Sequence, residues 1–227
     1  MARKRRRRLT RDDIVDAALD LAADKGWEAI RLHEVAAACD AGLDDIRQHF
    51  AEKDDIIDAW FDRADGAMLA CHDRGELAGL SARERLYALI TTWLDSLAPH
   101  QRVTREMIGH KLEFGHFHVQ FPAVLRISRT VQWIREGAHL DAPLPRRALE
   151  ETLLTALFVK TFVYWLRDHS AGQARTRSWL NRGLTALEAA APLIPGGQFS
   201  GEGGQAVDTG HTDGPRDEAS QSQPSSQ

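Results

Sequence analysis

Apolar side chains recur at intervals of three or four residues along almost the whole chain, from about residue 10 to residue 191. This interval is the period of an α-helix with one buried face, whereas a half-buried strand would alternate at every second residue. Alternation of the second kind is scarce in the sequence. The pattern therefore predicts an all-α protein.

Start and stop signals divide this pattern into separate helices. Thr10 is suited to cap the first helix and Gly26 to end it. Ser81 and Glu84 form a capping box for a later helix, which Pro99 stops. The other predicted helices cover residues 32–39 and 43–50, a stretch from about residue 53, and residues 102–113, 122–138, 145–168 and 176–191.

Charge is distributed unevenly along the chain, although the formal net charge is only −4. Residues 1–11 carry seven Lys or Arg and no acid, whereas residues 12–65 carry sixteen Asp or Glu against five Lys or Arg. A basic arm of this kind is typical of proteins that bind nucleic acid or an anionic membrane. The acidic block behind it argues against such binding, so charge alone leaves the partner open.

The cysteines and the N-terminal sequence indicate in which cellular compartment the protein is expected. Cys39 and Cys71 fall in helix-like stretches without a paired motif, so we expect neither a disulfide framework nor a zinc knuckle, and we place the chain in the reducing cytoplasm. The basic N-terminus lacks the apolar stretch of a secretory signal. The most apolar segment, residues 153–166, is broken by Lys160, so we predict no membrane span.

Residues 32–50 have the spacing of a helix-turn-helix. Two short helical segments lie on either side of Asp40, Ala41 and Gly42, and apolar residues tie the two segments together. In such a motif the second helix leaves its outer face free to enter the major groove of DNA. The spacing therefore favours nucleic acid as the partner.

The region around this motif resembles the TetR family of transcriptional regulators. The resemblance runs without a gap over about residues 10–60, and its most specific part is His49-Phe50, then Lys53 and an acidic-apolar helix with Ile56 and Ile57. It implies a TetR-like fold, with a three-helix DNA-binding domain and a larger helical domain for ligand binding and dimerisation. It also implies a cytoplasmic repressor that is a homodimer, binds a pseudo-palindromic double-stranded DNA operator, and is released or modulated by a small, largely apolar effector.

The domain boundaries follow from this resemblance and from composition. We expect a basic disordered arm at residues 1–9, the DNA-binding domain at 10–60 and the ligand-binding and dimerisation domain at 61–195. Residues 196–227 are rich in Gly, Ser, Gln, Pro and acids, which bury too little apolar surface to fold, so we predict a disordered tail.

The sequence departs from the family pattern within the helix-turn-helix. Arg31 stands where a Ser or Thr usually caps the second helix, and Asp40 stands where the turn usually has Gly. The recognition helix carries Asp44 and Asp45 in its first turn, where they suit the helix dipole but would repel phosphate. These departures weaken the DNA-binding inference more than the fold inference.

Six residues are the candidates for DNA contact. Arg47 can read guanine and Gln48 can read adenine, while His49 and Lys53 can bind phosphate. Arg5 and Arg7, in the arm, can lie along a minor groove. The competing interpretation is that these are solvated polar residues on an amphipathic helix and a solubilising basic run.

Residues 66–195 match the family's larger domain in length and helical content. The segment from Tyr164 to Ser170, with Trp179 after it, also resembles the end of a lipid-binding family of ubiquinone biosynthesis that shares the TetR fold. That family supplies the alternative function, an accessory protein that binds lipid and not DNA.

Two sets of apolar residues are candidate binding surfaces. A stripe on one long helix would be buried either in a dimer interface or in the protomer core, and we predict the interface: Phe158, Phe162, Trp165 and Leu166. A ligand pocket between helices would be lined by Trp93, Met107, Phe114, Phe117 and Trp133, for which packing in the core is the competing interpretation.

The sequence gives little support for metal binding or catalysis. His110, Glu113, His116 and His118 are spaced as metal ligands could be, but Gly115 interrupts the helix and no second carboxylate-histidine element accompanies them. No nucleophile elbow, phosphate loop or dinucleotide fingerprint occurs. We therefore expect no metal, no cofactor and no enzymatic activity.

Overall fold

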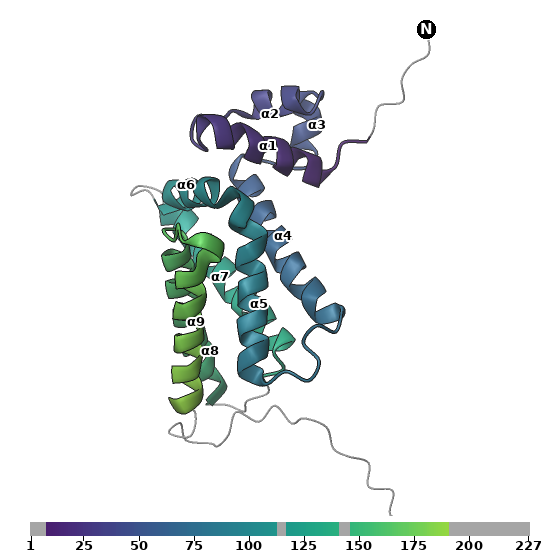
Figure 1. Cartoon of the computed structure of the whole chain (residues 1–227). Helices are drawn as coiled ribbons and strands as arrows, with labels where there is room; N and C mark the ends of the chain where they lie inside the picture. Colours follow the sequence, from purple (N-terminus) through teal and green to yellow (C-terminus); the bar gives the residue numbers. More distant parts are fainter. Residues whose placement is uncertain (1–7, 113–116, 141–145, 191–227) are drawn as a thin grey trace, which may run out of the picture.

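The computed structural model describes residues 8–112, 117–140 and 146–190, and the described residues form helices and turns without a strand, as predicted. Three helices form a headpiece at one end of the molecule: α1 (Arg11–Lys25), α2 (Leu32–Ala38) and α3 (Leu43–Arg47) (Figure 1). The body consists of the α-helices that follow: α4 (Asp54–Asp73), α5 (Ala82–Leu97), α6 (Gln101–Leu112), α7 (Phe117–Gly137), α8 (Arg146–Trp165) and α9 (Ala174–Ala190).

Helix α4 joins the two parts. It begins beneath the headpiece, runs down the body and packs along α5 (Figure 1). The proposed boundary near residue 60 therefore lies inside a continuous helix. A movement of α4 in the body would consequently be transmitted to the headpiece without an intervening flexible linker.

The predicted helix starts at Thr10 and Ser81 are confirmed. The hydroxyl of Thr10 accepts the N–H of Asp13 at 3.1 Å, and that of Ser81 accepts the N–H of Glu84 at 3.3 Å. Two predicted limits are wrong. Helix α7 begins at Phe117 and passes through residue 122, and α3 ends at Arg47 rather than at residue 50.

The body has an aromatic core in which α4, α5 and α8 meet. Trp93 stacks on Phe61 with ring centroids 5.9 Å apart. Phe158 and Phe162 form edge-on contacts with Trp93, with centroid distances of 5.1 and 5.4 Å. Trp165 is fully buried and stacks on Phe162. These contacts hold the three helices together through rings that fit closely.

This core corrects the predicted dimer stripe. Within the protomer, Phe158, Trp165 and Leu166 are buried and Phe162 is half-buried. Their spacing does place them on one face of α8, as expected, but that face points inward at Trp93 rather than outward at a partner. Periodicity identifies a buried face without identifying what covers it.

A buried carboxylate connects three helices of the body. Asp65 of α4 accepts hydrogen bonds from the indole of Trp93 at 2.8 Å and from the hydroxyl of Thr130 at 3.0 Å, and Arg126 lies 3.2 Å from it. Burial raises the pKa of Asp65 above the usual value for a carboxyl, and these three partners oppose that rise. The network fixes the relative positions of α4, α5 and α7.

The outward faces of α8 and α9 carry exposed aromatic side chains. Tyr164 is 41% exposed and Trp179 is 38% exposed, and their rings stack with centroids 5.9 Å apart. Val163 and Leu149, also on α8, are 42% exposed each. Large apolar groups that gather on one face of two neighbouring helices are typical of an interaction surface.

The turn before α9 is organised by Asp168. Its carboxylate accepts the N–H and the hydroxyl of Ser170 and the N–H and the hydroxyl of Thr176. Burial raises the pKa of Asp168, but these four hydrogen bonds outweigh it and hold the pKa well below the usual range. This carboxylate therefore fixes how α9 follows α8.

None of the helices that the described residues form combines the length and the apolar character required to cross a membrane.

Candidate nucleic-acid interface

The second helix of the predicted helix-turn-helix presents its polar residues to solvent. Val35, Ile46 and Phe50 are buried and fasten α2 and α3 to α1, and this leaves the opposite face of α3 outward. The side chain of Arg47 is 76% exposed on that face, and Gln48 follows it. Both predicted base-reading residues are therefore free of the core and accessible to a groove.

One carboxylate holds the two predicted base-reading side chains. Asp44 Oδ1 accepts from Nε and Nη2 of Arg47 at 3.2 and 3.1 Å, and its Oδ2 accepts from the amide of Gln48 at 3.4 Å. All three side chains are on the exposed side of the helix. Asp44 therefore orients Arg47 and also partly neutralises it.

Asp45 and Asp40 have local structural roles. The N–H of Gly42 donates to Asp45 at 2.9 Å, which satisfies the start of α3. Asp40 adopts a φ of +51°, in the left-handed region that favours Gly. Asp is one of the few other residues that tolerate this region, so the sequence departure at residue 40 is compatible with the turn.

Replacing Asp44 with Asn should tighten binding to DNA of any sequence by about twofold to tenfold at low salt, because an exposed negative charge is removed from the helix that is predicted to enter the groove. Asp45→Asn is the comparison variant, since it removes the same charge from the first turn of α3 while its side-chain oxygen can still accept from Gly42, and the lost dipole interaction should lower the melting temperature slightly. Affinities of both variants measured by fluorescence anisotropy at 50 mM and 200 mM salt check this. An unchanged affinity for Asp44→Asn at low salt would mean that this end of α3 does not approach DNA.

His49 and Arg11 lie where α1 and the end of α3 meet. Arg11 donates to the carbonyl oxygen of His49 at 3.4 Å, and its guanidinium lies over the ring of Phe50, 4.5 Å from the centroid. The imidazole of His49 is half-buried. Of the predicted arm contacts, Arg5 and Arg7 lie outside the described residues.

The structure gives Lys53 a role different from the predicted phosphate contact. Its ammonium donates to the carbonyl oxygens of Trp27, Glu28 and Ile30 at 2.6, 3.3 and 3.1 Å. It also lies 4.9 Å from the ring centroid of the buried Trp27. Burial is the main cause that lowers the pKa of Lys53. Because an ammonium has three donors, all of them are engaged in fixing the loop between α1 and α2 to the start of α4.

We expect Lys53→Met to lower the free energy of unfolding by about 1–3 kcal/mol, since it leaves the carbonyl oxygen of the buried Trp27 without that donor, whereas those of Glu28 and Ile30 still accept from Arg31. Lys25→Met is the control, because Lys25 is half-exposed and its ion pair with Glu34 contributes little. Urea denaturation measures both. Lys53→Met should leave the slope of log affinity for DNA against log salt unchanged. If the slope instead falls by about 0.9 while the stability stays normal, Lys53 contacts phosphate as first predicted.

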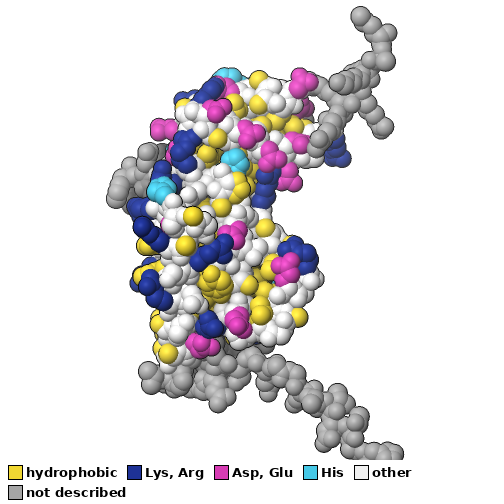
Figure 2. All heavy atoms as spheres, viewed as in Figure 1, with side chains coloured by type: hydrophobic (Ala, Val, Ile, Leu, Met, Phe, Trp, Pro, Cys, Tyr) yellow, Lys and Arg dark blue, Asp and Glu magenta, His cyan; other side chains and the backbone are white. Residues whose placement is uncertain are grey.

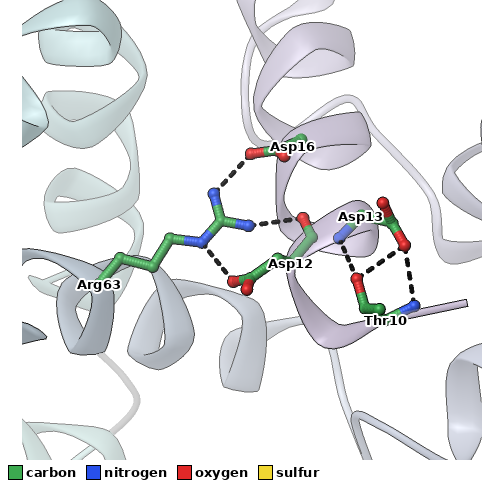
Figure 3. Close-up of polar contacts among 5 residues, drawn as sticks. All are labelled: Thr10, Asp12, Asp13, Asp16 and Arg63. Carbon is green, nitrogen blue, oxygen red and sulfur yellow. Dashed lines mark hydrogen bonds and ion pairs between the residues drawn. The ribbon is translucent and has the colours of Figure 1, made fainter.

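Many carboxylates of the acidic block, residues 12–65, have partners within the protein, and the ion pairs with Arg63 are the clearest example. Figure 3 shows its guanidinium, from α4, between Asp12 and Asp16 of α1. Nε of Arg63 donates to Asp12 Oδ1 at 2.8 Å, and Asp13 beside it completes the capping box with Thr10. The acids on this side of α1 therefore bind α1 to α4.

The acids of α4 face cations of the body. Asp58 pairs with Lys111 at 3.0 Å and Asp62 pairs with Arg126 at 2.8 Å. Asp55 accepts the N–H groups of residues 51 and 52 at the start of α4. The predicted repulsion between this acidic block and DNA is weakened, because many of its charges have partners within the protein.

Acidic side chains remain visible on the headpiece (Figure 2). Asp44 is the one whose position bears on DNA, with a side chain that is 74% exposed on α3. Affinity for phosphate would then come from other groups, of which the basic arm is the main candidate.

Helix α6 of the body contacts the headpiece directly. Glu106 accepts the backbone N–H of Trp27 at 2.8 Å and the guanidinium of Arg102 at 2.8 Å. Arg102 also donates to the carbonyl oxygen of Ala23 at the end of α1. The headpiece is therefore attached to the body through α6 as well as through α4.

The described residues of the predicted ligand pocket do not line a common cavity. Trp93 and Met107 are buried in the core, whereas Trp133 is 46% exposed. The buried residues Val131 and Ile134 occupy the inner face of α7, which turns Trp133 outward. Phe114 and the side chain of Phe117 lie outside the described residues.

A different cavity lies between α5, α8 and α9, at the end of the body remote from the headpiece. Its volume is about 140 Å³. Leucines make up most of the lining, and two of the polar lining residues, Arg83 and Glu188, form an ion pair at 3.2 Å. The residues that line the cavity are Ser81, Ala82, Arg83, Leu86, Leu140, Glu150, Leu153, Leu154, Leu184, Leu187 and Glu188. Such a site is suited to a small, mainly apolar molecule.

Among the described residues, no three or more His, Cys, Asp or Glu side chains are grouped as metal ligands would be. His110 lies 3.6 Å from Asp54, whereas Glu113, His116 and the side chain of His118 lie outside the described residues.

The outward aromatic pair of Tyr164 and Trp179 is a surface that the sequence analysis did not identify as a candidate interface. The only signal for this surface was that Tyr164 lies opposite the buried stripe on one predicted helix and that Trp179 lies on the next predicted helix.

Comparison with solved structures places the chain among transcriptional regulators. The TetR transcriptional regulator from Nitrosomonas europaea ATCC 19718 is 49% identical, with a TM-score of 0.71, over 78% of this chain and 96% of that one. A TetR transcriptional regulator from Rhodococcus sp. RHA1 is 17% identical, with a TM-score of 0.60, over 78% and 93% of the two chains, and supports the fold alone. No protein-family model and no curated protein matches the chain.

Proposed function

Because the chain belongs to the TetR family of DNA-binding transcriptional regulators, we propose that it acts as a homodimeric repressor at a pseudo-palindromic operator and is released by a small apolar effector. The observation that carries this proposal is the exposed face of α3, where Arg47 and Gln48 are held together by Asp44. A repressor that occupies DNA needs no catalytic step, so we assign the protein no reaction. Its place of action would be the cytoplasm.

Base reading is assigned to Arg47 and Gln48. Arg47 would donate to O6 and N7 of guanine, and Gln48 would pair with adenine in the major groove. Leu43, the first residue of α3, is 55% exposed and suited to contact a thymine methyl group. The arm would supply affinity that does not depend on sequence.

The dimer is assigned to the outward faces of α8 and α9. These faces carry the stacked pair of Tyr164 and Trp179, and Lys160, Arg167 and Arg175 line an open hollow beside Tyr164. One short recognition helix offers few base contacts, so a two-fold operator requires two copies. In a two-fold dimer each copy would bury the same patch, so the aromatic pairs of the two protomers would lie near each other.

Sedimentation velocity tests the dimer. The wild-type protein should be a dimer at micromolar concentration, and the double variant Tyr164→Glu/Trp179→Glu should be a folded monomer with an unchanged circular dichroism spectrum. Trp133→Glu, which alters an exposed tryptophan on α7, should remain dimeric. A monomeric wild-type protein would contradict the proposal, and a dimeric double variant would place the interface elsewhere.

The effector site is assigned to the leucine-lined cavity between α5, α8 and α9. A ligand can release DNA only if it binds the two conformations with different affinity. Because the cavity adjoins both helices of the proposed interface, its occupation would alter how two protomers pack and how far apart their headpieces lie. An apolar compound that releases the wild-type protein from its operator should fail to release Leu153→Trp, in which the cavity is filled. Release of that variant at the same concentration would place the effector site elsewhere.

A further inference from the structure

Two histidines face each other at the end of α4 that is remote from the headpiece. His72 lies in the last turn of α4, and His139 lies in the turn that follows α7. Their Nε2 atoms are 3.1 Å apart and their ring planes make an angle of 75°. The side chain of His72 is 37% exposed, so the pair is open to solvent. Neither residue belongs to the DNA-binding face or to the cavity.

The backbone at His139 is unusual. Its φ is +55°, a left-handed conformation that costs free energy in a residue with a side chain. This conformation occurs next to the contact between the two imidazoles. Strain of this kind is often found where a side chain is held for a function.

We propose that His72 and His139 form a binding site for one borderline divalent transition-metal ion, of the class of Zn²⁺, Ni²⁺ or Cu²⁺. Imidazole nitrogen is a preferred ligand for these ions, whereas Mg²⁺ and Ca²⁺ require oxygen ligands. Water would fill the remaining coordination positions. Two protein ligands make this a weaker site than a structural zinc site, which has four.

The separation of the two nitrogens fits such an ion. With metal–nitrogen bonds of about 2.0–2.1 Å, two ligands at a tetrahedral angle lie about 3.3–3.4 Å apart, and two at a right angle lie about 2.9 Å apart. The observed 3.1 Å lies between these values. Rotation of the rings out of their nearly head-on contact would be needed to direct both lone pairs at one ion.

Asp73 supports the metal-binding tautomer of His72. Its Oδ1 lies 3.3 Å from Nδ1 of His72, so Nδ1–H can donate a hydrogen bond to the carboxylate while Nε2 keeps its lone pair. A ligating histidine that donates its other nitrogen to a carboxylate is common at metal sites. Without metal, Nε2–H of His139 would donate to Nε2 of His72. When the ion binds, that proton would move to Nδ1 of His139, and both rings would stay neutral.

The experiment is a titration of the full chain, purified without a polyhistidine tag, with ZnCl₂ and separately with NiCl₂ by isothermal calorimetry. The wild-type protein should bind one more ion per protomer than His72→Ala or His139→Ala, with a higher melting temperature when loaded. Asp73→Asn should weaken that site about tenfold. The control His169→Ala removes an exposed histidine elsewhere and should bind as the wild type does.

The proposal would be overturned by equal stoichiometry and affinity in the wild type, His72→Ala and His139→Ala, or by loss in only one of the two variants. Melting curves without metal establish that the variants fold. Nitrogen-15 spectra of the histidine rings give a second reading, in which Zn²⁺ should shift the Nε2 signals of His72 and His139. The test does not involve DNA, so its outcome is independent of the proposed operator binding.

Discussion

Trp93→Ala should lower the free energy of unfolding by about 4 kcal/mol or more, the largest stability effect that we expect from a single substitution in this protein. The substitution empties the centre of the aromatic core, where Trp93 contacts Phe61, Phe158 and Phe162, and deleting a buried tryptophan costs about 3–5 kcal/mol. It also removes the N–H that donates to the buried Asp65, and a buried polar group left short of a partner adds about 1–3 kcal/mol. Urea denaturation of the wild type and the variant measures the difference.

Trp133→Ala is the matched control, since both tryptophans were predicted from the sequence to line one pocket. The exposed Trp133 should change the free energy of unfolding by less than about 0.5 kcal/mol. Equal effects of the two substitutions would contradict the assignment of Trp93 to the core.

Deleting residues 3–8 should reduce affinity for DNA of any sequence by about a thousandfold at 0.1 M salt. The deletion removes six Lys or Arg, and if four of them engage phosphate, each contributes about 0.9 to the slope of log affinity against log salt. The slope should therefore fall by about 3.6. Anisotropy titrations of one random duplex between 50 mM and 400 mM salt measure both quantities.

A variant with lysine at all six positions, residues 3–8, distinguishes the contribution of charge from that of the arginine side chain itself. Lysine keeps the charge, so affinity for random DNA should return to near the wild-type value, whereas arginine is favoured where a narrow minor groove is read. If the deletion leaves the salt slope unchanged, the arm does not contact phosphate.

Structural features that depend on interactions between residues a few positions apart could be predicted from the sequence. A cap is such a signal, because Thr10 and Asp13, or Ser81 and Glu84, satisfy each other three residues apart whatever surrounds them. Gly26 was also identified correctly, and its φ of +87° is open to glycine. The helix-turn-helix belongs to the same class, since its turn and its two short helices are contiguous.

Long-range partners could not be predicted in the same way. The spacing of Phe158 and Trp165 shows that one side of α8 is buried, but a second protomer or Trp93 would satisfy the same pattern. Lys53 was predicted to bind phosphate from its position within the family resemblance. Its actual partners are carbonyl groups more than twenty residues earlier in the chain. The pair of His72 and His139 depends in the same way on how α4 and α7 pack.

Selection of bound sequences from random double-stranded DNA by the purified protein, at 0.15 M salt, tests operator binding by a dimer. Operator binding by a dimer predicts enrichment of an inverted repeat whose half-sites lie about one helical turn apart, or a multiple of it. Arg47→Ala should lose preference at particular base pairs, at a cost of about 1–3 kcal/mol, while retaining its affinity for random DNA. Failure of the wild-type protein to enrich any inverted repeat would contradict the account.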